Sequence, residues 1–164
     1  MIVLLDTNVV LDVLLGREEF LKDSLAVMTK AVNNGDRMYI TASSITDIYY
    51  LMRKQTQNKD RAISDIKKLA TLFSFAEVNE ECIMRAFDSK LNDFEDAVVD
   101  SVAKHIKADY IITRNIKDFK RSKTKAITPI QYLQIKSPLC WSEPQNGHTS
   151  KKSQRQESLK VPVF

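Results

Sequence analysis

Short apolar runs alternate with longer segments of helical periodicity along this chain. The first run, residues 2–5, ends in the polar triplet Asp6-Thr7-Asn8, as a buried strand that leads into a helix does. Such alternation indicates a parallel sheet covered by helices. The pattern predicts strands at residues 2–5, 38–41, 73–78, 110–113 and 126–128. It predicts helices at residues 9–15, 20–33, 44–54, 60–72, 80–87, 96–107 and 129–134.

The character of the sequence changes at residue 137. Pro138, Pro144 and Pro162 lie beyond this point, among polar residues without periodicity. Segments of this composition do not bury enough apolar surface to fold. We therefore expect one α/β domain at residues 1–136 and a poorly ordered polar tail at residues 137–164.

Composition narrows the class of protein. Apolar residues make up 43% of the chain and charged residues 28%, which is typical of soluble globular domains. No apolar stretch has the length of a membrane span, and Asp6 comes too early for a secretory signal. Cys82 and Cys140 fit no disulfide framework or metal-ligand spacing. We expect a cytoplasmic protein with no membrane association.

Acidic residues recur at or beside the predicted strand-to-helix transitions. Ligands of open α/β sheets bind outside the carboxyl ends of the strands, so acids placed there would converge. The candidates for metal ligation are Asp6, Asp96, Asp93 and Asp118, and the predicted catalytic set is Asp6, Asp47, Asp96 and Asp118. Oxygen-only ligands suit Mg²⁺ or Mn²⁺, which support phosphodiester chemistry. Asn8, Thr113 and Asn115 are candidates for orienting water or ligands.

Several of these acids also have a structural explanation. Asp6 could cap the first helix, although Thr7 and Asn8 could serve equally well. Residues 44–47, Ser-Ile-Thr-Asp, match a capping box in which Asp47 reaches back to the helix start. Asp93 could likewise cap a helix, with Asp96 closing the box. Yet residues 93–96 hold three carboxylates, which repel one another unless a cation is present.

Four segments together resemble a known family. They are residues 5–9 (Leu-Asp-Thr-Asn-Val), 43–50 (Ser-Ser-Ile-Thr-Asp-Ile-Tyr-Tyr), 93–97 (Asp-Phe-Glu-Asp-Ala) and 110–119 (Tyr-Ile-Ile-Thr-Arg-Asn-Ile-Lys-Asp-Phe). Their order and spacing resemble those of PIN-domain proteins, in particular VapC-like toxins. The resemblance implies a three-layer α/β/α domain with a central parallel sheet and an acidic Mg²⁺ or Mn²⁺ site. It also implies an endoribonuclease specific for single-stranded RNA, a homodimer and a cognate antitoxin.

Six bases and one acid lie between Arg114 and Lys125. In a nuclease of this family, Arg114, Lys117, Lys120 and Arg121 would hold RNA phosphates. The alternative is a solvated loop that binds nothing.

The chain departs from the family pattern at two positions. Asp47 stands where the family usually has Glu, and Asn115 stands where many members have Asp, so that Asp118 would take the fourth acidic role. These departures keep open a catalytically degenerate PIN domain that acts as an RNA-binding or protein-interaction module. A receiver-type phosphorylation domain is a third hypothesis, but the third predicted strand lacks the phosphoacceptor Asp.

Overall fold

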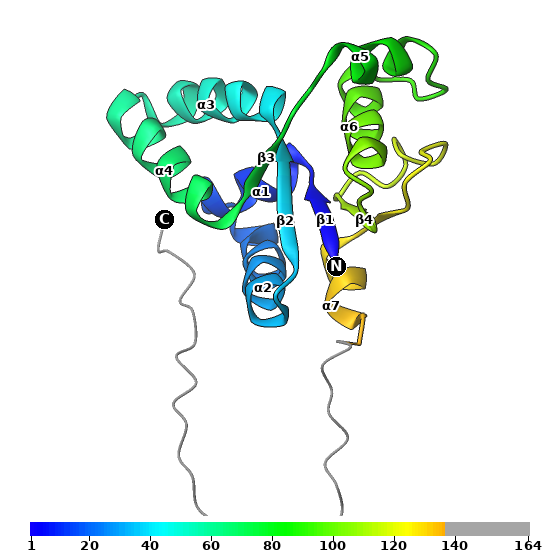
Figure 1. Ribbon diagram of the computed structural model, residues 1–164. Helices are drawn as coiled ribbons and strands as arrows, with labels where there is room; N and C mark the ends of the chain where they lie inside the picture. The colour runs from blue at the N-terminus through cyan, green and yellow to red at the C-terminus, as the bar shows by residue number, and fades with distance from the viewer. Residues whose placement is uncertain (137–164) are drawn as a thin grey trace, which may run out of the picture.

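The computed structural model describes residues 1–136, so the predicted tail and Cys140 lie outside the described residues. Within this range strands and helices alternate as the pattern predicts (Figure 1). The strands are β1 (Ile2–Leu5), β2 (Arg37–Thr41), β3 (Ser74–Ala76), β4 (Tyr110–Ile112) and β5 (Ala126–Ile127). The helices are α1 (Thr7–Leu14), α2 (Glu18–Asn34), α3 (Ala42–Thr56), α4 (Lys59–Leu72), α5 (Glu80–Phe87), α6 (Phe94–His105) and α7 (Pro129–Gln134).

The five strands form one parallel sheet in the order β3-β2-β1-β4-β5. The strand order reverses at β1, because the chain proceeds through β2 and β3 on one side and through β4 and β5 on the other. In the register of β1 and β4, Leu5 lies opposite Ile112. The residues that follow these two strands, Asp6 and Thr113, therefore meet at the position where open α/β sheets bind ligands.

Two hydrophobic clusters cover the two faces of the sheet, because successive side chains of a strand point to opposite faces. Val3 and Leu5 belong to the larger cluster, which includes residues of α1, α2, α3, α4 and α7. Leu4 belongs to the other, which includes residues of α5 and α6. Phe119, in the loop that follows β4, is 3% exposed and packs into this second cluster. The three-layer α/β/α fold is thus confirmed.

Helix caps account for the main differences from the predicted bounds. Helix α3 begins at Ala42 because the Thr41 hydroxyl accepts a hydrogen bond from the N–H of Ser44. Helix α6 begins at Phe94, two residues earlier than predicted, because Asp93 is its N-cap. Strand β3 is shorter than predicted and pairs only with β2, at the edge of the sheet. None of the helices in residues 1–136 is long and apolar enough to cross a membrane.

Candidate acidic functional site

Asp6 lies at the carboxyl end of β1, in the centre of the sheet, and is 9% exposed. Its Oδ2 accepts a hydrogen bond of 2.7 Å from the hydroxyl of Thr113 and another from Nδ2 of Asn8. Asn8 in turn accepts a hydrogen bond from the N–H of Arg114 through Oδ1. Asn8 and Thr113 therefore hold the Asp6 carboxylate between α1 and the end of β4, and their role in orienting water or ligands stays a prediction.

This arrangement argues against a capping role for Asp6. The residue occupies the N-cap position of α1, yet its side chain makes no capping hydrogen bond. Burial raises the pKa of the Asp6 carboxyl above its ordinary value, and the hydrogen bond from Thr113 opposes that shift. The fold thus holds a desolvated carboxylate at the ligand-binding edge of the sheet.

Asp96 has the most perturbed acidity of the site. Its pKa is raised from the ordinary 3.8 to about 7, first by burial and then by the negative charges of Asp6, Asp93, Asp118 and Glu95. Like charges at short range disfavour the ionised form of each. The structure therefore brings together acids from β1, α6 and the loop after β4, which are far apart in the sequence.

Asp93 does cap α6, as the structural alternative proposed. Its Oδ1 accepts hydrogen bonds from the N–H groups of Glu95 and Asp96. The reciprocal bond that would make Asp96 part of a capping box is not formed. Capping thus accounts for Asp93 but leaves the carboxylate of Asp96 without a structural role.

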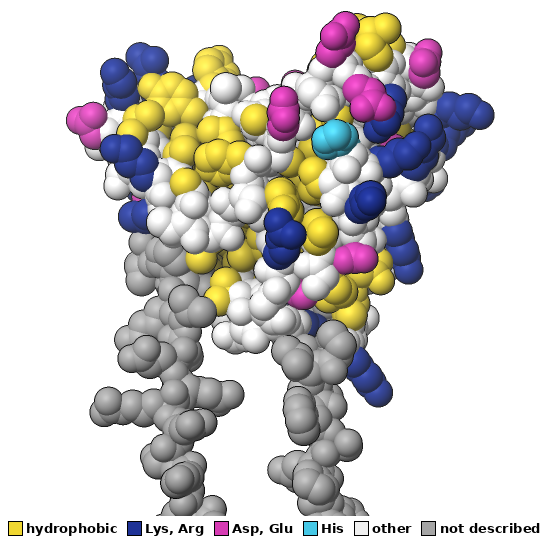
Figure 2. All heavy atoms as spheres, viewed as in Figure 1, with side chains coloured by type: hydrophobic (Ala, Val, Ile, Leu, Met, Phe, Trp, Pro, Cys, Tyr) yellow, Lys and Arg dark blue, Asp and Glu magenta, His cyan; other side chains and the backbone are white. Residues whose placement is uncertain are grey.

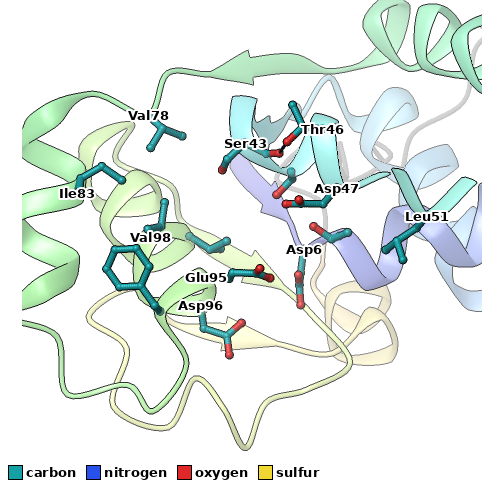
Figure 3. A pocket seen from close by; sticks show the side chains of 14 residues that line it. Asp6, Ser43, Thr46, Asp47, Leu51, Val78, Ile83, Glu95, Asp96 and Val98 are labelled. Carbon is teal, nitrogen blue, oxygen red and sulfur yellow. Dashed lines mark hydrogen bonds between the residues drawn. The ribbon is translucent and has the colours of Figure 1, made fainter. Parts of the chain in front are cut away.

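Asp47 does not take part in a capping box. The N-cap of α3 is Thr41 instead of Ser44, so Asp47 lies beyond the first turn of the helix. Its side chain lines a cavity of about 350 Å³ together with Asp6, Glu95 and Asp96. In Figure 3, Asp6 and Asp47 lie on one side of this cavity, with Glu95 and Asp96 of α6 on the other. Glu95 is exposed where it borders the cavity.

The rest of the cavity lining is mostly apolar. Phe94 is 47% exposed and lies beside the acids, and its ring stacks on that of Phe87 with the centroids 5.2 Å apart. Further apolar lining comes from Leu51, Val78, Ile83, Val98 and Val99. The cavity therefore combines carboxylates with a surface suited to flat apolar groups.

The loop after β4 carries several of the predicted residues. The N–H of Asn115 donates to the hydroxyl of Thr113, and the N–H of Asp118 donates to the carbonyl of Asn115. Asn115 and Asp118 are both exposed, as are the bases Lys117 and Lys120. Arg121 lies elsewhere, in the lining of a second pocket.

Arg114 contacts a buried carboxylate that the sequence pattern did not reveal. Asp12 of α1 is fully buried, and its Oδ2 lies 3.0 Å from Nε of Arg114 and accepts a hydrogen bond from Ser24. Arg17 lies 3.4 Å from the other oxygen of Asp12, and the Arg114 guanidinium stacks on the ring of Phe20. Asp12 stood within an apolar helix, which was the available signal for a buried acid. The phosphate-binding role of Arg114 stays a prediction beside this structural one.

The donor set at the cavity fits a hard cation in its chemistry. All the potential ligand atoms are carboxylate oxygens. No base in residues 1–136 forms an ion pair with any of the five acids, which are Asp6, Asp47, Glu95, Asp96 and Asp118. Mg²⁺ and Mn²⁺ prefer such oxygen ligands. No group of three acidic, His or Cys side chains in residues 1–136 is arranged to hold a metal ion as it stands. A bound ion would therefore need these carboxylates to move closer together.

Comparison with solved structures shows the same fold in three complexes. VapBC2 from Rickettsia felis, bound to a promoter DNA fragment, matches with a TM-score of 0.61 and 17% identity over 78% of this chain and 98% of that chain. VapBC-1 from nontypeable Haemophilus influenzae matches with a TM-score of 0.61 and 18% identity over 79% and 99%. FitAB bound to the IR36 DNA fragment matches with a TM-score of 0.57 and 18% identity, over 77% of this chain and 94% of that chain.

Sequence comparison gives the family. No curated protein matches the chain significantly. A family model described as "PIN domain" matches residues 2–117, a range that contains β1 to β4 together with Asp6, Asp47, Glu95 and Asp96. With that match over most of the chain and the three-layer fold, the chain belongs to the PIN-domain family.

Proposed function

We propose that this protein is a Mg²⁺- or Mn²⁺-dependent endoribonuclease that cleaves single-stranded RNA. The observation that carries the proposal is the position of Asp96. This carboxyl group lies among four other acids, has a pKa raised to about 7 and makes no ion pair with a residue in the described range. A protein keeps such repulsion most readily where a cation relieves it.

Asp6, Asp96 and Asp118 would hold the ion, and Asp93 could add its second oxygen while the first caps α6. When bound, the ion supplies charge neutralisation and a more acidic water. Asn8 and Thr113 orient the Asp6 carboxylate, and Asn115 lies in the same hydrogen-bonded turn. Asp47, which is shorter than the usual Glu, would act on the same cavity through a water molecule.

The apolar lining of the cavity favours a single strand as the substrate. Bases of single-stranded RNA are free to stack on aromatic side chains, whereas bases in a duplex are not. Phe94, half exposed beside Asp96, offers such a surface.

We also propose that the protein is the toxin of a toxin–antitoxin pair. The similar solved structures are VapBC and FitAB assemblies, and the fold of this chain covers nearly all of the matched chains. An antitoxin would silence the enzyme by covering the acidic cavity, and the toxin would form a homodimer. Copurification with the product of a neighbouring reading frame, and light scattering of the isolated protein, would test these two partners.

The decisive experiment is cleavage of a mixed single-stranded RNA pool with Mn²⁺ or with EDTA. We expect cleavage by the wild type that requires the metal and is lost in Asp6→Asn. The matched control is Asp60→Asn, which removes the same charge from an exposed position at the start of α4. Asp47→Glu should retain or raise activity, because the longer side chain reaches further into the cavity. Metal-independent cleavage, or equal cleavage by Asp6→Asn, would refute the proposal.

Asn115 and the short Asp47 favour a second candidate, a degenerate PIN domain that binds RNA without cleaving it. The two candidates differ in metal affinity, because a degenerate site should bind Mn²⁺ poorly. Calorimetric titration of the wild type and of Asp96→Asn with Mn²⁺ separates them. Tight binding lost in Asp96→Asn supports the enzyme, and equally weak binding by both supports the degenerate module.

A further inference from the structure

A second pocket lies on another face of α6 and has the opposite charge. It measures about 250 Å³ and is lined by five basic side chains and two acidic ones. The bases are Arg85, Lys90, Lys104, Arg121 and Lys123, which come from α5, α6 and the two loops that follow α5 and β4. In Figure 2, dark blue Lys and Arg side chains gather on the right of the molecule, the side that α5 and α6 form in Figure 1.

The cations of this pocket are available to a ligand. In residues 1–136, the ammonium groups of Lys90, Lys104 and Lys123 form no ion pair. Arg85 pairs with Glu81, and Arg121 makes a single long contact of 3.5 Å to the carbonyl of Lys90. Several unpaired cations around one hollow attract an anion of high charge density.

A buried hydroxyl provides independent support for a ligand. Ser101 lies on α6 and lines the pocket between Ala97 and Lys104, which share its helix face. Its side chain is 6% exposed, and its Oγ has no hydrogen-bond partner in the part of the chain that the structure describes. Buried hydroxyl groups normally have a partner, and an oxygen of a ligand in the pocket would supply one.

The carboxylate of Asp100 fixes one side of the pocket through several hydrogen bonds. Asp100 accepts hydrogen bonds from the Ser122 hydroxyl, at 2.5 Å, and from the N–H groups of Lys123 and Thr124, both at 3.1 Å. These bonds fix the loop that carries Arg121 and Lys123 against α6. Because Asp100 is saturated in this way, it opposes a bound anion less than a free carboxylate would.

We infer that this basic pocket is a binding site for a backbone phosphate of an RNA strand, outside the acidic cavity. The inference rests on the proposed function for the identity of the strand. Helix α6 joins the two sites, since Asp96 borders one and Lys104 the other, about 12 Å apart along the helix axis. A single strand that follows the surface of α6 from one pocket to the other would bind at both. The pocket anchors the strand while the acidic cavity acts on it.

Asp88 favours a ribonucleotide over an acidic peptide. It lines the pocket, and its carboxylate has no hydrogen bond or ion pair within residues 1–136. A free carboxylate repels Asp and Glu side chains, but it accepts a hydrogen bond from a ribose 2′-hydroxyl. Cations for the phosphate beside an acceptor for the sugar match the two parts of a nucleotide.

The test uses the full chain in EDTA, so that binding is measured without cleavage. The variant is Lys104→Ala/Lys123→Ala, and the matched control is Lys22→Ala/Lys67→Ala, which removes two exposed lysines from α2 and α4. Fluorescence anisotropy with a labelled single-stranded RNA gives affinity as a function of salt. Loss of one phosphate contact should make the slope of log K against log salt shallower by about 0.7. The control should keep the wild-type slope.

Two further arms identify the ligand. Inorganic phosphate should shift the amide resonances of Ser101 and Lys123 in the wild type. Asp88→Ala, which removes the acceptor for the 2′-hydroxyl, should narrow the difference in affinity between RNA and DNA of the same sequence. If the pocket variant binds RNA with the wild-type slope, the inference is overturned. It is equally overturned if inorganic phosphate shifts these resonances while RNA binding ignores the variant, since the site then serves a free anion, or if a polyglutamate peptide competes as well as RNA does.

The nuclease proposal is tested independently of the phosphate site. Asp6→Asn removes a carboxylate of the acidic cavity and leaves the basic pocket unchanged, so it should keep the salt slope of the wild type in EDTA. Absence of cleavage with a pocket-dependent slope would reject the enzyme and retain the phosphate site.

Discussion

At the scale of single residues, Asp96 illustrates how the fold creates a reactive group. On an isolated helix surface its carboxyl group would titrate near 3.8, but in the folded protein partial burial and four neighbouring acids raise the pKa to about 7. In the absence of metal, the folded state therefore binds a proton at Asp96 that the unfolded chain has already released at the same pH. The buried Asp6 shifts in the same direction.

This linkage predicts that the metal-free protein loses stability as the pH rises from about 4 to about 7. Within that window the folded state holds more protons than the unfolded state, so the free energy of unfolding falls with pH and levels off above it. Thermal melts in EDTA should show this fall, and Asp96→Asn should flatten it and melt higher than the wild type at pH 8. Asp60→Asn should follow the wild-type profile. A variant Asp96→Asn that melts lower at every pH would mean that this carboxylate stabilises the fold.

At the scale of elements, the buried pair of Asp12 and Arg114 connects α1 to the segment that follows β4. Asp12 is fully buried, and it receives Arg114, Arg17 and Ser24 from three different segments. The same segment after β4 carries Thr113, which donates to Asp6. The ion pair therefore supports the geometry of the acidic site from behind.

We predict that Asp12→Asn lowers the free energy of unfolding by on the order of 3 kcal/mol, because removal of one partner leaves a partly buried guanidinium without its counter-charge. Urea unfolding at neutral pH measures the loss. Asp60→Asn, which removes an exposed charge, should change stability by no more than about 0.5 kcal/mol. If Asp12→Asn were as stable as the wild type, the prediction would be wrong, and water would have to solvate Arg17 and Arg114 as favourably as Asp12 does.

At the scale of the whole molecule, one sheet separates two hydrophobic clusters and aligns two sites of opposite charge along α6. Both clusters, the complete sheet and both pockets lie within residues 1–136. A sheet buried on both faces and covered by seven helices in this range is large enough to fold by itself.

We therefore expect a chain of residues 1–136 to fold and to melt at the same temperature as the full-length protein. Circular dichroism melts of the two chains provide the comparison. For a domain of this size, a loss of 1 kcal/mol would lower the melting temperature by roughly 3–5 °C, which is readily measured. A drop of that size would show that residues 137–164 contribute to stability.

The sequence by itself determined the class of fold and most of the elements. The apolar run at residues 2–5 and the helical periodicities are local signals, because burial of one face imposes its period on the chain. Gly35 is a local signal of another kind, since it ends α2 in the left-handed conformation, with φ 67°, that glycine favours. The candidate acids could also be chosen from sequence, since each lies at or near the end of a strand or the start of a helix.

Only the tertiary structure decided which of these residues meet. The contact of Asp6 with Thr113 spans 107 positions and depends on β4 pairing with β1, which no local pattern specifies. The structure also distinguished the role of Asp93, a helix cap, from that of Asp96. It placed Arg114 against the buried Asp12, and Arg121 in the basic pocket. Periodicity reports which side of an element is buried, but the neighbours of a side chain follow from strand order and packing, which are properties of the whole chain.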